Sequence, residues 1–169
     1  LVRPGDLYVA LPGLHAHGAG FTGQAVGRGA VAVLTDPEGA SAAGDPGVPI
    51  LVSERLRPVM AAVSARVYGE PARGLELFGV TGTNGKTTTV ALLEATLAAM
   101  GRRVGTIGTL GFRIGGRALA SGRGTVTTPD SPDLQGLLAV MREQGAEAVA
   151  IEVSSHAMAM ARVDAIRFE

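Results

Sequence analysis

The sequence predicts an α/β protein: a small N-terminal α/β domain, followed by a domain with a mainly parallel β-sheet and helices on both faces. Strand-like and helix-like segments alternate along the chain, as they do in proteins with parallel sheets. The 25 Gly and 9 Pro residues lie between apolar segments, where turns are expected. A polar break containing Pro and Gly separates two such patterns. We therefore expect domains at residues 1–70 and 75–169, joined by a linker at 71–74.

The composition excludes several classes of protein. With 169 residues, 46% of them hydrophobic, the chain can bury a core in one domain or two small ones. Fifteen Lys and Arg residues balance fifteen Asp and Glu residues, so no net charge attracts nucleic acid or an anionic membrane. The absence of Cys excludes disulfides, thiolate metal sites and a cysteine nucleophile. We find no secretory signal and no apolar run of roughly 18 residues, and therefore expect a cytoplasmic protein without membrane insertion.

The N-terminal domain is expected to contain two strands and a helix. Residues 30–34 (AVAVL) form a short apolar run ending in a turn at 35–37, and residues 49–52 are a second strand candidate. A helix is predicted from about 54 to 68, and its apolar residues should pack on these strands. Residues with helical spacing mark that apolar face: Leu56, Val59, Met60, Val63 and Val67.

The second domain is expected to continue the alternation of strands and helices. We predict a strand at 75–80, a helix at 90–100, a strand at 104–109, a hairpin at 112–119, a helix from Ser131 and a strand at 148–153. Gly101 follows the Ala- and Leu-rich helix as a C-terminal cap, and Ser131 precedes Pro132 as an N-terminal cap would. Strands separated by helices favour a mainly parallel sheet covered on both faces.

A glycine-rich loop carries the strongest chemical signal. Residues 81–89 (TGTNGKTTT) lie between a predicted strand and a predicted helix, which is the order of a P-loop-type phosphate site. Its backbone N–H groups can face an anion, Lys86 can reach the outer phosphates, and the Thr87 hydroxyl can bind magnesium. The generic pattern has Gly where this chain has Val80, so the loop is a variant. The alternative is a plain Gly-rich turn with a surface lysine.

The variant loop resembles the ATP-binding loop of the Mur ligase and folylpolyglutamate synthetase superfamily. Two later segments, residues 127–135 (TTPDSPDLQ) and 152–163 (EVSSHAMAMARV), resemble substrate-binding motifs of its MurE branch, the UDP-N-acetylmuramyl-tripeptide synthetases. Residues 3–13 (RPGDLYVALPG) and 29–37 (GAVAVLTDP) are similar to the uridine-binding N-terminal domain of that branch. The resemblance therefore covers nearly the whole chain.

This resemblance implies a cytoplasmic ligase of peptidoglycan synthesis. Such an enzyme uses ATP and Mg²⁺ to add the third amino acid to UDP-N-acetylmuramoyl-L-alanyl-D-glutamate, through an acyl phosphate. Its substrates would be that UDP-linked dipeptide and a free amino acid, which can be meso-diaminopimelate, L-lysine or another; the oligomeric state stays open. We expect both ends to be truncated, with part of the central domain and the C-terminal amino-acid-binding domain absent, and expect this stretch to lack turnover alone.

The resemblance also assigns site residues. The ATP group is Gly82, Thr83, Asn84, Gly85, Lys86, Thr87 and Thr88. The substrate group is Leu14, His15, Ala16, Thr127, Thr128, Ser154 and Arg162. Lys86 and Glu152 are the catalytic assignments, and Thr87 and Glu152 are the metal ligands. Glu152 also ends a predicted buried strand, where ligand sites of α/β sheets lie, although a solvated strand-end carboxylate would look the same.

Some residues and the function itself leave alternatives open. His156 either orients a ligand or bonds a nearby loop, and His15 with His17 lacks the carboxylates of a metal site. Another ligase of the superfamily would share the glycine loop but should lack the segments at 127–135 and 152–163. A non-catalytic ATP-binding module is the second alternative, whereas a simple kinase is disfavoured because no kinase motif set is present.

Overall fold

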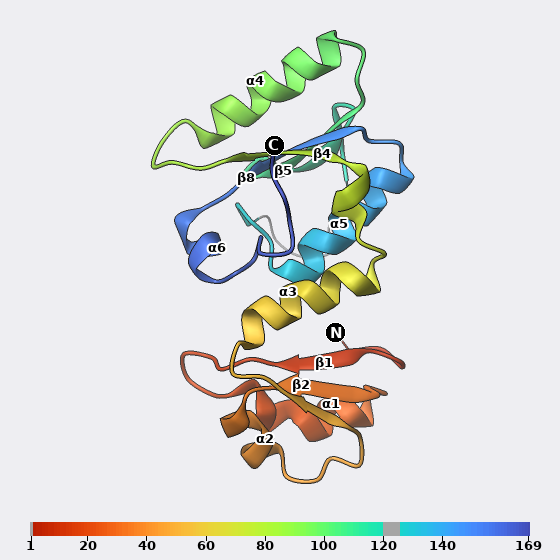
Figure 1. The fold of residues 1–169 in the computed structure, drawn as a ribbon, viewed down its shortest axis with the longest axis vertical. Coiled ribbons are helices and arrows are strands. Elements are labelled where there is room, and N and C mark those ends of the chain that lie inside the picture. The colour runs from red at the N-terminus through yellow and green to blue at the C-terminus, as the bar shows by residue number, and fades with distance from the viewer. Residues whose placement is uncertain (1, 120–125) are drawn as a thin grey trace. The chain divides into compact units, whose positions relative to one another are not determined.

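A computed structural model describes residues 2–119 and 126–169 and shows a mixed α/β protein with two separate sheets (Figure 1). The chain forms two compact units, Leu1–Met60 and Ala61–Glu169. The predicted α/β class with parallel strands is confirmed. Within the described residues, no helix is both long enough and apolar enough to cross a membrane.

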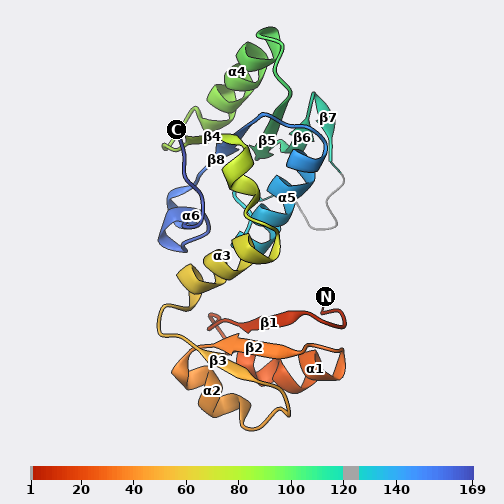
Figure 2. The same cartoon turned by 45° about the vertical axis from the view of Figure 1, so that its right-hand side comes forward.

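The first unit is a three-stranded parallel sheet with helices on one face. Strands β1 (Leu7–Ala10), β2 (Ala32–Thr35) and β3 (Ile50–Val52) lie in the order β1-β2-β3. The helical elements between them are η1 (Gly18–Phe21), α1 (Thr22–Gly27) and α2 (Pro37–Ala43). Figures 1 and 2 show α1 and α2 on the same side of this sheet. Ala10, Ala19 and Val33 form its small buried core.

The turn expected at 35–37 is instead the start of helix α2. Asp36 has an extended backbone and caps the helix, because its side chain accepts a hydrogen bond from Gly39 N. Pro37 takes the first helical position, where its missing N–H costs nothing. The prediction of a simple turn was therefore wrong, since the same residues that make a turn also begin a helix.

The division between the units falls earlier than the expected linker. It lies after Met60, within helix α3 (Leu56–Val67). Leu56 and Met60 are buried as predicted, but Val67 is 72% exposed, so the apolar face is shorter than its spacing suggested. Residues 71–74 form a 3₁₀ turn, η2 (Pro71–Gly74), that packs against α5 within the second unit. A Pro-containing stretch can begin a helical turn as readily as it can form a linker.

The second unit contains a five-stranded sheet in the order β4-β8-β5-β6-β7. Its strands are β4 (Glu76–Val80), β5 (Val104–Gly108), β6 (Gly111–Ile114), β7 (Arg117–Ala118) and β8 (Ala148–Glu152). Strands β4, β8 and β5 are parallel, whereas β5, β6 and β7 pair antiparallel in turn. The predicted hairpin is confirmed, and Figure 2 shows β6 and β7 at one edge of the sheet.

Helices cover both faces of this second sheet, as predicted (Figure 1). Helix α5 (Ser131–Glu143) packs its apolar residues on Leu77, Ile107 and Ile151. Helix α4 (Lys86–Ala99) packs Leu97 against the opposite face, at Val104 and Ala148. Because side chains alternate along a strand, Glu152 shares the α4 face with Ala148.

Helices α4 and α5 begin where the preceding loops fix their first residues. Helix α4 begins at Lys86, four residues earlier than expected, because Gly85 takes a left-handed conformation just before it. In α5 the cap position is Asp130 rather than Ser131, whose buried hydroxyl points to Ala161 O at 3.4 Å. A short helix that the sequence analysis missed, α6 (Ser155–Ala159), follows β8 and is capped by Ser154.

Candidate functional site

The glycine-rich loop connects β4 to α4 and leaves the start of α4 open. Residues 81–85 are exposed. Gly82 (φ 142°) and Gly85 (φ 81°) both have positive φ values, which favour glycine, and a Cβ at Gly85 would meet nothing. No side chain in the described part of the chain caps the first N–H groups of α4. These donors and the positive end of the helix dipole are therefore available to an anion.

Lys86 lies folded over this loop. Its ammonium donates to Gly82 O at 2.7 Å and to Thr83 O at 3.3 Å. It is also the only lysine in the sequence, beside 14 arginines. The loop carbonyls thus hold a compact positive charge at the N-terminus of α4, where it adds to the helix dipole.

The buried carboxylate of Glu152 is the centre of the polar cluster beside the loop. Glu152 is only 2% exposed. Thr87 donates its hydroxyl to Oε2 at 3.0 Å, while Thr109 donates its backbone N–H to Oε1 at 3.0 Å and its hydroxyl to Oε2 at 3.1 Å. Gly108 makes room for this carboxylate, because a Cβ there would overlap with Oε1. The alternative of a solvated strand-end carboxylate is therefore wrong for Glu152.

Thr109 was missed by the sequence analysis, although a signal for it existed. It directly follows β5, which pairs with β8 in parallel, so the carboxyl ends of the two strands meet at Glu152. Thr109, like Glu152, lies at the carboxyl end of a sheet strand, where ligand sites of α/β sheets are found, but only the strand order places the two residues side by side.

The spacing of Thr87 and Glu152 fits a magnesium ion. The two oxygens lie 3.0 Å apart. Adjacent ligands of an octahedral Mg²⁺, each at about 2.05 Å, are separated by about 2.9 Å. The described residues contain no group of three or more His, Cys, Asp and Glu side chains able to hold a metal. The pair therefore fits an ion that takes its other ligands from water and phosphate, as Mg²⁺ commonly does.

The predicted substrate residues of this unit surround the same strand end. Thr128 is buried, donates its hydroxyl to Glu152 O at 2.7 Å and accepts from Ser154 N at 3.1 Å. Arg162 donates to Thr128 O at 2.8 Å and pairs with Asp130 at 2.7 Å. These contacts fix the backbone beyond β8, whereas the Thr127 hydroxyl lies at the surface, 3.3 Å from that of Thr109. His156 is exposed beside this cluster, on α6.

The remaining predicted residues lie in the first unit, on a loop that follows β1. Leu14, His15 and Ala16 are exposed at its tip, and Leu14 is 99% exposed. A hydrogen bond from Gly18 N to Leu11 O, at 2.8 Å, closes the loop. The structure thus presents this tripeptide to solvent at the tip of the loop.

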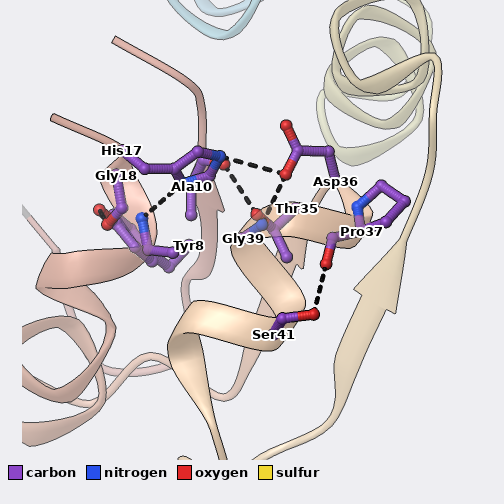
Figure 3. Close-up of polar contacts among 10 residues, drawn as sticks. Tyr8, Ala10, His17, Gly18, Thr35, Asp36, Pro37, Gly39 and Ser41 are labelled. Atoms are coloured by element: carbon purple, nitrogen blue, oxygen red, sulfur yellow. Dashed lines mark hydrogen bonds and ion pairs between the residues drawn. The ribbon is translucent and has the colours of Figure 1, made fainter.

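His17 anchors the base of that loop to helix α2 (Figure 3). Its Nδ1 accepts a hydrogen bond from Ala19 N at 3.0 Å, so this nitrogen carries a lone pair. The proton is then on Nε2, which donates to Asp36 Oδ1 at 3.1 Å. Gly39 N donates to the same oxygen at 2.7 Å. Both nitrogens of His17 are thus engaged in hydrogen bonds within the first unit.

Two titratable groups of this cluster are shifted from their ordinary values. The Gly39 N–H holds the pKa of Asp36 below its usual value, and His17 adds to that effect. Burial raises the pKa of Tyr8, whose hydroxyl donates to Gly18 O at 2.8 Å. Asp36 is thus an ionised helix cap that also holds the loop.

Comparisons with known proteins agree on one family. The profile of the Mur ligase middle domain matches residues 80–169. The chain is 54% identical, over 99% of its length, to "UDP-N-acetylmuramoyl-L-alanyl-D-glutamate--2,6-diaminopimelate ligase" of Streptomyces avermitilis, and covers 32% of that protein. It is 48% identical to "UDP-N-acetylmuramyl-tripeptide synthetase" of Leifsonia xyli subsp. xyli, with the same coverage of each chain.

A solved structure supports the same comparison. The chain matches a structure of UDP-N-acetylmuramoyl-L-alanyl-D-glutamate--2,6-diaminopimelate ligase with a TM-score of 0.78 and 26% identity. This match covers 99% of the chain and 33% of the solved protein. The chain therefore spans about a third of the length of the relatives it matches.

Proposed function

This chain belongs to the Mur ligase family, as its motifs predicted, and we propose that it is the nucleotide-binding part of a MurE-type ligase. The ligase would use ATP to add the third amino acid to UDP-N-acetylmuramoyl-L-alanyl-D-glutamate in the cytoplasm. The observation that carries this proposal is the pairing of Thr87 with the buried Glu152 directly beside the open N-terminus of α4. Identity of 54% to a relative with that name supports the choice of reaction.

The first step of the proposed reaction is phosphoryl transfer from ATP. A carboxylate oxygen of the substrate attacks the γ-phosphorus, the bond to the β-phosphate oxygen breaks, and ADP leaves with that electron pair. The loop at residues 82–88 would hold the phosphates by its N–H groups, and Lys86 would neutralise their charge. Thr87 and Glu152 would hold Mg²⁺, which supplies further charge neutralisation on the transferred phosphoryl group.

The second step forms the amide bond. The amine of the incoming amino acid attacks the acyl phosphate, and phosphate leaves from the tetrahedral intermediate. 2,6-Diaminopimelate is the first amino acid to test, because it stands in the name of the relative from Streptomyces avermitilis. L-Lysine is the second. We assign the exposed tripeptide Leu14, His15 and Ala16 to the uridine nucleotide, and the surface hydroxyl of Thr127 to the sugar-peptide.

Phosphate release by the full-length protein that carries this chain tests the proposal. The assay contains ATP, Mg²⁺ and UDP-N-acetylmuramoyl-L-alanyl-D-glutamate, and receives one amino acid at a time. We expect release that needs both the UDP-linked dipeptide and one particular amino acid. Binding of ATP without stimulation by any amino acid would instead favour a non-catalytic ATP-binding module. The 169-residue chain alone should bind ATP and release no phosphate.

A further inference from the structure

Two threonine hydroxyls connect the buried Glu152 carboxylate with the surface. The Oγ1 of Thr127 lies 3.3 Å from the Oγ1 of Thr109, and Thr109 Oγ1 lies 3.1 Å from Glu152 Oε2. Glu152 itself is 2% exposed. This chain of hydrogen bonds runs from a surface group in the proposed substrate site to a proposed metal ligand.

The chemistry of the three groups sets the direction of these hydrogen bonds. An ionised carboxylate only accepts, and each threonine hydroxyl has a single hydrogen to donate. The hydrogen of Thr109 goes to Glu152, because a bond to a charged acceptor is stronger than one to a neutral hydroxyl. Thr127 must therefore donate to Thr109, and its lone pairs remain for a ligand.

Thr109 holds both oxygens of the carboxylate at once. Its N–H binds Oε1 and its hydroxyl binds Oε2, whereas Thr87 binds Oε2 alone. When Thr87 and Glu152 turn their oxygens to a cation, the bond between them is lost but both bonds from Thr109 can stay. The carboxylate would then keep its orientation as the ion binds, at little reorganisation cost.

We propose that Thr109 is a positioning residue that holds Glu152 in its metal-binding orientation and couples it, through Thr127, to a donor group of the sugar-peptide substrate. This inference rests on the function proposed above. A substrate N–H or O–H that donates to Thr127 keeps the series of hydrogen bonds intact and polarises these bonds toward Glu152. A substrate oxygen that needed a hydrogen from Thr127 would break the bond from Thr127 to Thr109. Metal and sugar-peptide should therefore strengthen each other's binding, because such coupling is reciprocal.

The test measures Mn²⁺ binding by electron paramagnetic resonance in the full-length protein with ADP, with and without UDP-N-acetylmuramoyl-L-alanyl-D-glutamate. Mn²⁺ is the probe for the Mg²⁺ site. Thr109→Val removes the hydroxyl and keeps the N–H, and Thr109→Ser restores the hydroxyl. Thr96→Val makes the same chemical change at an exposed position of α4 and serves as the matched control. We expect about tenfold weaker Mn²⁺ binding in Thr109→Val and recovery in Thr109→Ser.

Coupling supplies a second readout that a purely structural role would not change. In the unchanged protein and in Thr96→Val, the UDP-linked dipeptide should tighten Mn²⁺ binding by about fivefold, and this effect should vanish in Thr109→Val. Thr127→Val should also abolish the coupling while leaving the donors from Thr87 and Thr109 in place, which keeps the test available if Thr109→Val does not fold.

The possible outcomes distinguish failure of the hydrogen-bond relay, which is the coupling of Glu152 to Thr127 through Thr109, from failure of the proposed function. Mn²⁺ affinity and coupling that are unchanged in Thr109→Val would overturn the relay alone, as would a dipeptide that weakens Mn²⁺ binding in the unchanged protein. An unchanged protein that binds neither Mn²⁺ nor ADP would overturn the proposed function, and the relay with it.

Discussion

Asp36 and Glu152 occupy equivalent places in the two sheets, yet their surroundings differ. Asp36 directly follows β2, which lies between β1 and β3, and Glu152 ends β8, which lies between β4 and β5. Asp36 accepts hydrogen bonds from the Gly39 N–H and from His17, and its side chain is 21% exposed. Glu152 is almost fully buried, and two of the hydrogen bonds that it accepts come from threonine hydroxyls.

We propose that the difference between these donors distinguishes the structural carboxylate of Asp36 from the metal-binding carboxylate of Glu152. The Gly39 N–H belongs to the first turn of α2, so Asp36 cannot release it without fraying the helix. A hydroxyl can rotate, so Thr87 can exchange its bond to Glu152 for a shared cation. A carboxylate at the end of a central strand is therefore not by itself evidence of a binding site. The kind of hydrogen-bond donor that it faces, a backbone N–H or a rotatable hydroxyl, is the more informative feature.

The largest effect is expected at Glu152. Glu152→Gln would place an amide NH₂ among the donors from Thr87 and Thr109 and remove the negative charge that we propose binds the metal. We expect at least about a thousandfold loss of dipeptide-dependent phosphate release, measured in the full-length protein. Glu143→Gln, the same change at an exposed position of α5, is the control and should stay close to the unchanged rate. Activity of Glu152→Gln near that of the control would remove Glu152 from the site.

The second largest loss of activity is expected on substitution of Lys86. Lys86→Ala removes the ammonium held above the loop and should lower turnover by about 10² to 10³-fold. Because Lys86 is the only lysine of this chain, a lysine-directed reagent reports on it directly. ATP with Mg²⁺ should protect this lysine in the 169-residue chain, as read by mass spectrometry of the peptide that contains it. Equal labelling with and without ATP would contradict the proposed phosphate site.

A smaller effect, on stability rather than on turnover, is expected at Asp36. Asp36→Ala removes the cap of α2 and should cost about 1 kcal/mol, seen as faster amide exchange at Gly39. Asp45→Ala removes an exposed bond to Gly47 and is the control, with a cost below that of Asp36→Ala. An unchanged exchange rate at Gly39 would show that the cap contributes nothing.

The stability contribution of Asp36 should also depend on pH. Because the folded-state pKa lies below the unfolded value, the ionised carboxylate stabilises the fold. This contribution is complete above the unfolded value of about 3.9 and is lost as the pH falls through the lower folded-state pKa. The difference between the unchanged chain and Asp36→Ala should therefore shrink on acidification below about pH 4. A difference in the free energy of unfolding that grows as the pH falls would contradict this prediction.

The smallest effect is expected at His17. His17→Ala removes the bonds to Ala19 N and Asp36 and should cost about 1 kcal/mol or less, since only the loop base is released. Affinity for UDP should fall by a few-fold, because the tip at residues 14–16 loses its anchor. His15→Ala tests the tip itself, and should weaken UDP binding without changing the amide exchange of Ala19. Equal amide exchange of Ala19 in His17→Ala and His15→Ala would show that His17 does not anchor the base of the loop.

The sequence predicted the second unit better than the first. Strands β4, β5 and β8 each have five residues, and β5 and β8 are buried throughout; the predictions at 75–80, 104–109 and 148–153 match the three strands within one residue. Strand β1 has four residues, three of them only partly buried, and was missed because so short a pattern cannot be distinguished from that of a loop. Helix α2 was missed because Asp36 and Pro37 suit both a turn and a helix start.

The residues of the candidate site also differ in how far the sequence predicts them. Thr87 was named from the glycine-rich loop and Glu152 from the family resemblance, with its strand end in support, and the structure brings the two side chains into contact. Thr109 depends on β5 lying beside β8, a long-range order that local patterns do not encode. The contacts between His17 and Asp36 likewise join a loop and a helix that are 19 residues apart.

Paramagnetic broadening by Mn²⁺ with ADP compares the two carboxylates most directly, in a single spectrum of the 169-residue chain. We expect selective broadening of the Thr109 and Gly108 amides beside Glu152. We expect sharp signals for the Ala19 and Gly39 amides beside Asp36. Broadening at Asp36, or none at Glu152 while ADP is bound, would contradict the assignment of one carboxylate to the fold and the other to the ligand.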